Sequence, residues 1–358
     1  MWFDSIRVSN VRCLESLEYR PRVGCNLVCG ANASGKTSLL EAIAIASFGK
    51  SFLTNRTSEV VRRGTQGLSV RAVIVSSEGV PSQVVVRKEK GATRILADGQ
   101  LLAAASLLAQ RIPTLVINSK APDLLTASPS NRRALIDRTM FHVEPTYVDT
   151  WKCYRQTLQQ RNRLLRRHGG YQEADYWDRR LAEHAEAIDL ERTTIIETVN
   201  RSLAQCELFP NLGILSFEYR PGWSRSRPLK DQLKAAWVRD RRLGHTTIGA
   251  HRADMTLRGA GVAISKLLSR GQGKAIVCTV VAALAEFIRL RTGRAPVLLI
   301  DDLAAELDDR IRCAIVDMIN GIEGQRIYTA IKPSNLPEIA DIVPDAFHVE
   351  HHEMVQMA

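Results

Sequence analysis

The segment Gly30 to Lys50, GANASGKTSLLEAIAIASFGK, constrains the fold of this chain more than any other. Its first eight residues match G-x-x-x-x-G-K-[ST], in which backbone N–H groups and a helix N-terminus bind phosphates. Residues 26–29 precede it as the end of a short strand, and apolar side chains at helical spacing follow it from Ser38 to Phe48. The sequence therefore predicts a strand, a phosphate-binding loop and a helix.

The loop residues have different expected roles at a nucleotide. Lys36 would reach the terminal phosphates and act as a catalytic cation, and Thr37 would ligate Mg²⁺. A random match to this pattern in a chain of this length is expected about one time in a hundred. The expected nucleotide contacts are Gly30, Ala31, Asn32, Ala33, Ser34, Gly35, Lys36 and Thr37.

Composition narrows the class of protein. The 358 residues are 45% hydrophobic and 24% charged, and no apolar run approaches the roughly 20 residues that span a bilayer. The N-terminal segment lacks the apolar core of a signal peptide, and the seven cysteines show no C-x-x-C spacing. We therefore expect a cytoplasmic protein without a zinc site. The net charge of +11 favours a polyanionic partner.

Two carboxylates follow an apolar run late in the sequence. In APVLLIDDLAAELDD, residues 297–300 are typical of a fully buried parallel strand. Asp301 at its carboxyl end would hold Mg²⁺ beside Thr37, and Asp302 would orient or deprotonate an attacking water. The alternative is that both acids only cap the following helix.

A long helix is expected just before this strand, in LLSRGQGKAIVCTVVAALAEFIRL. Its first N–H groups and its positive dipole end would face an anion. Ser269, Gly271 and Gln272 are the residues expected to contact that anion. Alternatively, the segment is a plain helix start that Ser269 caps.

The apolar pattern divides the chain into three zones. Residues 1–118 are rich in strands around the loop, residues 119–208 are almost wholly helical, and residues 209–358 return to α/β character. We therefore expect an α/β domain made of an N-terminal and a C-terminal lobe, with an inserted helical arm.

Two segments carry an excess of basic residues. The first arm helix, Lys152 to Arg167, contains Arg161 and Arg163 and no acid, whereas residues 173–197 are rich in acids. Ion pairing across the hairpin and contacts to phosphates are both open explanations. Residues 220–242 contain eight basic residues against two acids, and we expect Arg239, Arg241 and Arg242 to contact a nucleic-acid backbone without reading its sequence.

In their order along the chain, these segments resemble the ATP-binding-cassette heads of structural-maintenance and double-strand-break-repair ATPases. They are most similar to the RecF family of bacterial recombination and gap-repair proteins. The resemblance runs essentially the whole length. The strings that carry it are SIRVSNVRCLESLEY, GANASGKTSLLEAI, SPSNRRALIDRTMF, QRNRLLR, GAHRADM, LLSRGQGK and LIDDLAAELDD.

The resemblance implies a P-loop ATPase head that uses ATP and Mg²⁺ and dimerises when ATP is bound. Ser269 and Gly271 of a second subunit would then contact the γ-phosphate, and the dimer would clamp DNA near single-strand gaps. RecR, RecO and RecA are the implied partners, in gap repair and the SOS response. Two other classes share the nucleotide chemistry: the motor subunit of a membrane transporter, whose helix would normally begin L-S-G-G-Q, and a P-loop kinase.

Several positions depart from the family pattern. Ala33 stands where the family usually has glycine, which is tolerable if its φ is negative. Gly273 replaces a usual leucine, and Ala305 replaces a small hydroxyl residue. Asn118 is the available candidate for sensing the γ-phosphate, and no histidine follows RIYTAI. We therefore expect weak, DNA-stimulated ATP hydrolysis, and these departures bear on the rate of hydrolysis more than on ATP binding.

Overall fold

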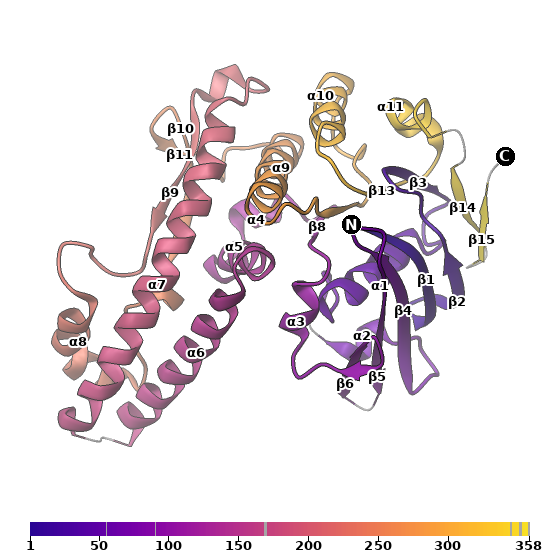
Figure 1. Ribbon diagram of the computed structural model, residues 1–358. Coiled ribbons are helices and arrows are strands. Elements are labelled where there is room, and N and C mark those ends of the chain that lie inside the picture. The colour runs from indigo at the N-terminus through magenta and orange to yellow at the C-terminus, as the bar shows by residue number, and fades with distance from the viewer. Residues whose placement is uncertain (55, 90, 168–169, 344–345, 351–352, 357–358) are drawn as a thin grey trace. The chain divides into compact units, whose positions relative to one another are not determined.

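The computed structural model describes residues 1–54, 56–89, 91–167, 170–343, 346–350 and 353–356 (Figure 1). Contacts between residues divide the chain into two compact units. Unit 1 contains Met1–Pro122 and Ser269–Ala358, and unit 2 is Asp123–Leu268. Each unit builds its own sheets and helices.

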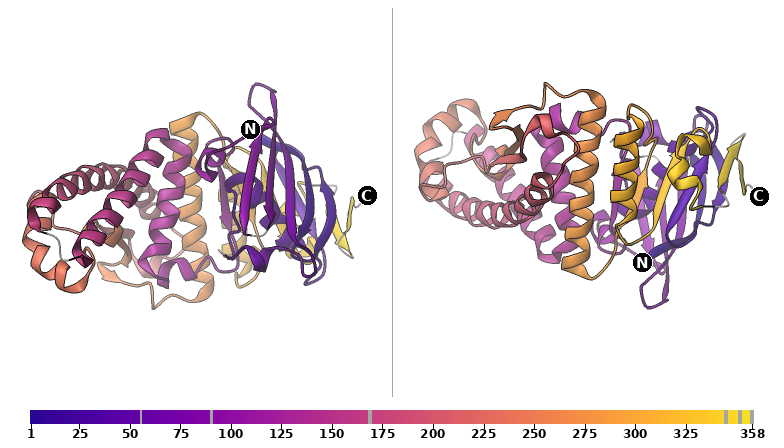
Figure 2. Two further views of the ribbon diagram at one scale, coloured as in Figure 1. Left: turned by 90° about the horizontal axis from the view of Figure 1, so that it is seen from below. Right: turned by 90° about the horizontal axis from the view of Figure 1, so that it is seen from above.

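The first sheet of unit 1 is antiparallel, with the strand order β2-β1-β4-β5-β6-β7. Buried and exposed residues alternate along β1 and β4, as expected for a sheet with one face on the core and one in water. Figure 2 shows its strands side by side. The strands are β1 (Trp2–Val11), β2 (Leu14–Tyr19), β4 (Gly67–Val75), β5 (Pro81–Glu89), β6 (Ala92–Ala97) and β7 (Gln100–Leu101).

The second sheet of unit 1 has the order β15-β14-β3-β13-β12-β8. Its strands pair in parallel from β14 to β8, and β15 is antiparallel to β14. All four residues of β12 are buried, as the apolar run predicts for a central parallel strand. The strands are β3 (Cys25–Cys29), β8 (Thr114–Ile117), β12 (Val297–Ile300), β13 (Arg326–Ala330), β14 (Phe347–Glu350) and β15 (Glu353–Gln356).

Helix α1 (Lys36–Phe48) is almost entirely buried because its side chains join one apolar core with residues of both sheets. That core includes Ile6 and Val70 of the first sheet and Leu299 and Ile327 of the second. The other helices of unit 1 are α2 (Thr57–Val60), α3 (Ala105–Ala109), α9 (Arg270–Thr292), α10 (Asp309–Asn320) and α11 (Pro337–Ala340), with the 3-10 turn η3 (Pro333–Asn335).

Unit 2 is built around two long helices, α6 (Pro145–Arg166) and α7 (Tyr171–Ala204), which lie side by side in Figures 1 and 2. The sequence predicts this hairpin from its two amphipathic patterns. The remaining elements are α4 (Asp123–Thr126), α5 (Pro129–Val143), η1 (Pro210–Leu212), β9 (Leu215–Arg220), α8 (Leu229–Leu243), η2 (Ala250–Arg252), β10 (Asp254–Gly259) and β11 (Val262–Ala263).

The division into units differs from the expected zones. The sequence assigns residues 209–358 to the C-terminal lobe, but residues 209–268 pack with the helical hairpin in unit 2. The Asn200 amide of α7 exchanges hydrogen bonds with the backbone N–H and carbonyl of Phe217 in β9, at 2.7 and 3.0 Å. Helix α8 packs on α6 and α7. The strand β9 therefore belongs with the arm.

Two further expectations concern the whole chain. None of the helices in the described part of the chain is long and apolar enough to cross a membrane. All seven cysteines lie in that part, and none of them forms a disulfide.

Candidate functional site

Gly35, in the loop between β3 and α1, has a backbone conformation that residues with a Cβ rarely adopt. Its φ is +119°, and a Cβ there would lie 2.8 Å from Cδ2 of Leu14. At Gly30 a Cβ would lie 2.6 Å from the carbonyl oxygen of Val349. The loop therefore fits between β14 and the β1–β2 turn because both positions lack a side chain.

The Lys36 amine lies inside the loop. It donates hydrogen bonds to the carbonyl oxygens of Gly30 and Ala31, at 2.7 and 2.8 Å. Burial lowers the pKa of Lys36, and the nearby Asp301 and Asp302 oppose this shift. Phosphate oxygens would replace these carbonyls as charged partners of the amine, and such charge-assisted hydrogen bonds are about twice as strong as neutral ones.

Thr37 and Asp301 meet where β3 and β12 end at the same edge of the parallel sheet. The Thr37 hydroxyl donates to the Asp301 carboxylate, with Oγ1 2.9 and 3.0 Å from its two oxygens. Burial raises the pKa of Asp301, and hydrogen bonds from Thr329 and Thr37 oppose the shift. Hydroxyl and carboxylate oxygens are ligands that Mg²⁺ prefers, so this pair fits the ion beside a bound phosphate.

Thr329 on β13 is a functional-site residue that sequence reasoning missed. Its hydroxyl donates to Asp301 at 2.8 Å and accepts from the backbone N–H of Asp302 at 3.0 Å. It therefore fixes both residues of the acidic pair. From the sequence we considered only a histidine after this strand. The position of Thr329 beside the acidic pair follows from the strand order, in which β13 lies between β3 and β12.

The two acids do not cap the next helix. Helix α10 begins at Asp309, and its cap is Asp308, whose carboxylate accepts from the backbone N–H of Ile311 at 2.9 Å. Asp302 instead has a left-handed backbone, with φ +50°. The alternative interpretation of Asp301 and Asp302 as helix caps is therefore wrong.

The start of α9 has the geometry of a capped helix. The Ser269 hydroxyl accepts from the backbone N–H of Gln272 at 3.2 Å, and the Gln272 side chain accepts from the N–H of Ser269 at 3.0 Å. Ser269 is exposed, and a Cβ on Gly271 would overlap the carbonyl oxygen of Glu306. In the single chain this segment thus forms a capping box and contacts the loop after β12.

Ala33 does not have the expected negative φ. Its φ is +65°, in the left-handed region that costs a residue with a Cβ roughly 1–2 kcal/mol. The position where the family usually has glycine is therefore strained here.

A cavity of about 290 Å³ opens beside the loop. Arg12 of the β1–β2 turn lines it, and its guanidinium pairs with the buried Glu41 of α1 at 2.7 Å. Arg12 and Cys13 were not expected at the site, because Cys13 lies 17 positions before Gly30 and its approach to the loop depends on the register of the β1–β2 hairpin. The cavity is lined by Arg12, Cys13, Ala33, Gly35, Lys36, Thr37 and Ser38.

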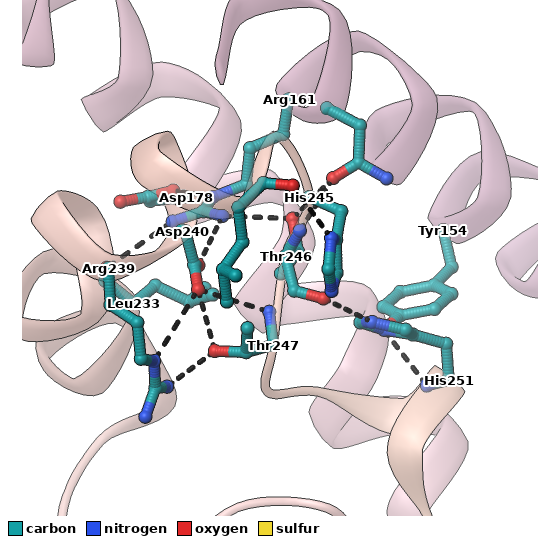
Figure 3. A network of polar contacts seen from close by, with 12 residues as sticks. Tyr154, Arg161, Asp178, Leu233, Arg239, Asp240, His245, Thr246, Thr247 and His251 are labelled. Carbon is teal, nitrogen blue, oxygen red and sulfur yellow. Dashed lines mark hydrogen bonds and ion pairs between the residues drawn. The ribbon is translucent and has the colours of Figure 1, made fainter. Parts of the chain in front are cut away.

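Arg161 is not available to a nucleic acid, contrary to the sequence-based expectation. Its side chain is 0% exposed and pairs with Asp178 at 2.6 Å and with Asp240 at 2.8 Å. Figure 3 shows this network, which also includes Thr246. The explanation by ion pairing across the hairpin is therefore correct for Arg161, while Arg163 is exposed.

The basic excess of residues 220–242 is partly neutralised by acids from outside that stretch. Arg239 contacts Thr247 and lies 3.9 Å from Asp240, whereas Arg242 is exposed and has no partner among the described residues. Arg239 shares the Asp240 carboxylate with the buried Arg161 (Figure 3), whereas Arg241 and Arg242 lie on the exposed surface of α8. The ion pairs formed with β9 and α7 are Arg220–Glu218, Arg225–Asp189 and Lys230–Asp175, each at 3.0 Å.

Comparisons with known proteins cover the whole chain. The model of the RecF/RecN/SMC N-terminal domain matches residues 3–353. The DNA replication and repair protein RecF of Vibrio atlanticus is 32% identical over 351 residues, which are 98% of this chain and of that protein. Its counterpart in Vibrio parahaemolyticus is 32% identical over 347 residues, 96% of each chain.

Solved structures show the same fold. A structure of the recombination mediator protein RecF with ATP, from the RecFOR pathway, superimposes with a TM-score of 0.88 at 25% identity, over 100% of this chain and 98% of that one. An SMC head bound to the C-winged helix domain of ScpA superimposes with a TM-score of 0.59 at 15% identity, again over 100% and 98%. The similarity to the SMC head concerns the fold alone.

Proposed function

Because this chain belongs to the RecF family, we propose that it is an ATP-dependent DNA-binding protein of replication and recombinational repair. The observation that carries the proposal is the contact between Thr37 and Asp301, which joins the phosphate-binding loop to the acid after β12. The whole-length similarity to RecF relatives supports this function rather than a transporter motor subunit or a P-loop kinase.

ATP would lie along the loop from Gly30 to Thr37. Lys36 would exchange its two carbonyl partners for phosphate oxygens, and Thr37 and Asp301 would hold Mg²⁺. The metal, when bound, neutralises phosphate charge. Asp302 would orient or deprotonate the attacking water, and the hydrogen bond from its N–H to Thr329 fixes its backbone for that role.

We further propose that two copies of the chain close around ATP. The cap residue Ser269 and the first residue of α9, Arg270, are exposed, and the first N–H groups of a helix lack intrahelical backbone partners. Ser269, Gly271 and Gln272 of a second copy would contact the γ-phosphate once the Ser269 cap turns from the N–H of Gln272 to the anion.

DNA, a cytoplasmic location and the partners RecR, RecO and RecA complete the proposal. The net charge of +11 supports a polyanionic ligand. The similarity to a recombination mediator protein of the RecFOR pathway supports partners from gap repair. Arg163, Arg239, Arg241 and Arg242 remain proposed contacts to the DNA backbone.

The test is DNA binding by the full chain, with and without ATP, on gapped, single-stranded and duplex substrates. We expect ATP to strengthen binding in the wild type and to have no effect in Lys36→Ala. Arg201→Ala, on the exposed surface of α7, loses the same charge and serves as the control. ATP-independent DNA binding by the wild type would contradict the proposal.

A further inference from the structure

Four arginines lie on the exposed face of the first sheet. Arg7, Arg71, Arg87 and Arg94 come from β1, β4, β5 and β6, which are consecutive neighbours in the sheet. All four are exposed, and the residues that flank Arg7 and Arg71 along their strands are buried. Because side chains of a strand alternate between its faces, these arginines point away from the core that holds α1.

The strand register places them next to one another. Arg7 lies directly opposite Arg71, and Arg87 lies directly opposite Arg94. Arg71 pairs with Val85, so Arg87 is its diagonal neighbour on the next strand. Opposite Cβ atoms are about 5 Å apart and diagonal ones about 7–8 Å apart, and the three strand spacings together span about 14 Å. The four guanidinium groups therefore form one continuous strip, which we call the arginine face.

The arginine face has little internal charge compensation. Arg7 pairs with Glu18 at 2.9 Å. The side chains of Arg71, Arg87 and Arg94 make no hydrogen bond or ion pair with any residue in the described part of the chain. Like charges that are directly opposite destabilise a sheet, so the pair Arg87–Arg94 has an unfavourable interaction, and neither side chain forms an ion pair with a described residue.

The residues between the arginines suit a backbone ligand. One row across the strands reads Ser9, Ser69, Arg87 and Arg94, and the next reads Arg7, Arg71, Val85 and Leu96. Arginine and serine side chains are typical partners of phosphate oxygens. These two described rows contain no aromatic ring on which an unpaired base could stack, as it does in proteins that bind single strands.

We propose that the arginine face binds the sugar-phosphate backbone of duplex DNA. An isolated anion would need a concave site, whereas here the charges are spread over about 14 Å of open sheet. The ligand must therefore carry several phosphates in a row, and guanidinium groups can bind each of them with two hydrogen bonds. The inference rests on the proposed DNA-binding function and assigns to it a surface on unit 1.

This surface differs from the one expected from sequence. The basic residues 220–242 of unit 2 have Glu218, Asp189 and Asp175 as partners, whereas the three arginines of β4, β5 and β6 have none among the described residues. A cation that has no ion-pair partner can neutralise a DNA phosphate without first breaking an ion pair within the protein. Each phosphate neutralised in this way releases condensed counterions from the DNA. The arginine face is therefore expected to contribute more to the salt dependence of binding than helix α8.

The experiment compares the full-length wild type with Arg71→Glu/Arg87→Glu/Arg94→Glu on duplex DNA in the presence of ATP. We expect affinity at physiological salt to fall at least about tenfold, and the slope of log K against log salt to flatten by roughly two to three units. ATP affinity should stay unchanged, because none of these residues lines the cavity at the loop.

Two further variants make the result decisive. Arg56→Glu/Arg291→Glu/Arg310→Glu changes the net charge equally at exposed residues off the arginine face and should bind DNA nearly like wild type. Arg71→Gln/Arg87→Gln/Arg94→Gln should reproduce the flattened slope, even where charge reversal perturbs folding. Wild-type affinity and slope in the Gln variant, or equal losses in the control, would overturn the proposal. If the wild type itself fails to bind DNA with ATP, the proposed function fails as well.

Discussion

The buried amine of Lys274 joins the first turns of α9 to the acidic strand end: it donates a 2.7 Å hydrogen bond to the carbonyl oxygen of Asp302. A second bond, at 2.8 Å, reaches the carbonyl of Ala305. Asp302 and Glu306 both have left-handed backbones, with φ of +50° and +72°. Lys274 therefore holds an unusual loop, and it links the segment proposed to contact a partner's ATP to the acidic pair proposed to act at the chain's own nucleotide.

Lys274→Met tests this link. Methionine fills a similar volume but leaves the two half-buried carbonyls without this donor, so we expect the free energy of unfolding to fall by about 1–3 kcal/mol. ATP-induced dimerisation should weaken while ATP affinity of the monomer changes little. Sedimentation with ATP and urea unfolding measure the two effects. Lys266→Met, at an exposed lysine, is the control. Wild-type dimerisation in Lys274→Met would limit the residue to a structural role.

Asp301→Asn should separate stability from ligand binding. Burial raises the pKa of Asp301, so its charge costs stability at a pH above its folded pKa. We expect the ligand-free variant to melt at a higher temperature than wild type near pH 7.5, and this advantage to shrink as the pH falls and the wild-type acid becomes protonated. Mg²⁺-dependent ATP binding should be lost. A variant that melts below the wild type at neutral pH would contradict this cost.

Arg161→Met should destabilise unit 2 without directly removing a DNA contact. It leaves Asp178 and Asp240, both 0% exposed, without their cation, and loss of one partner from a buried ion pair typically costs about 3–5 kcal/mol. Urea unfolding measures the loss. Arg163→Met, two residues further along α6 and exposed, should change stability by less than about 0.5 kcal/mol. Similar losses in the two variants would contradict the burial of Arg161.

The sequence predicts the loop and the contact between Thr37 and Asp301, because these parts are local or share one sheet edge. The spacing of Gly30, Gly35 and Lys36 specifies the loop, and parallel strands end at the same edge, so Thr37 and Asp301 meet although 264 residues separate them. The family, the α/β head and the inserted helical segment were predicted correctly from motifs and their order.

The sequence does not reveal contacts that depend on packing between distant segments. Arg161 looks like an exposed cation, because Asp240, 79 residues further along, becomes its partner only when α8 packs on α6. Thr329 is an ordinary strand residue until β13 is placed beside β12. The φ of Ala33 follows from the path of the loop, which residue types do not specify.

His251 should make unit 2 less stable in acid. Its Nδ1 lies 2.7 Å from the Tyr154 hydroxyl and its Nε2 3.0 Å from the carbonyl of Thr246 (Figure 3). Burial lowers the pKa of His251 to about 4, with a smaller contribution from the nearby cations Arg252 and Arg133, while the bond to Thr246 and the charge of Asp240 oppose the shift. The folded state therefore binds fewer protons than the unfolded state between pH 4 and pH 6.5, so stability is lost as the pH falls through this window.

The magnitude follows from the same shift. At about 1.4 kcal/mol for each pH unit below 6.5, the loss between pH 7.5 and pH 4.5 is about 2.5 kcal/mol. His251→Gln removes the titration, so it should be less stable than wild type at pH 7.5, where it lacks the imidazole contacts, and the difference should narrow by about 2.5 kcal/mol at pH 4.5. Urea unfolding of both chains at the two pH values measures this difference, in which the other titrating groups cancel. A difference that stays constant with pH would mean that His251 is protonated in the folded chain as readily as in the unfolded one.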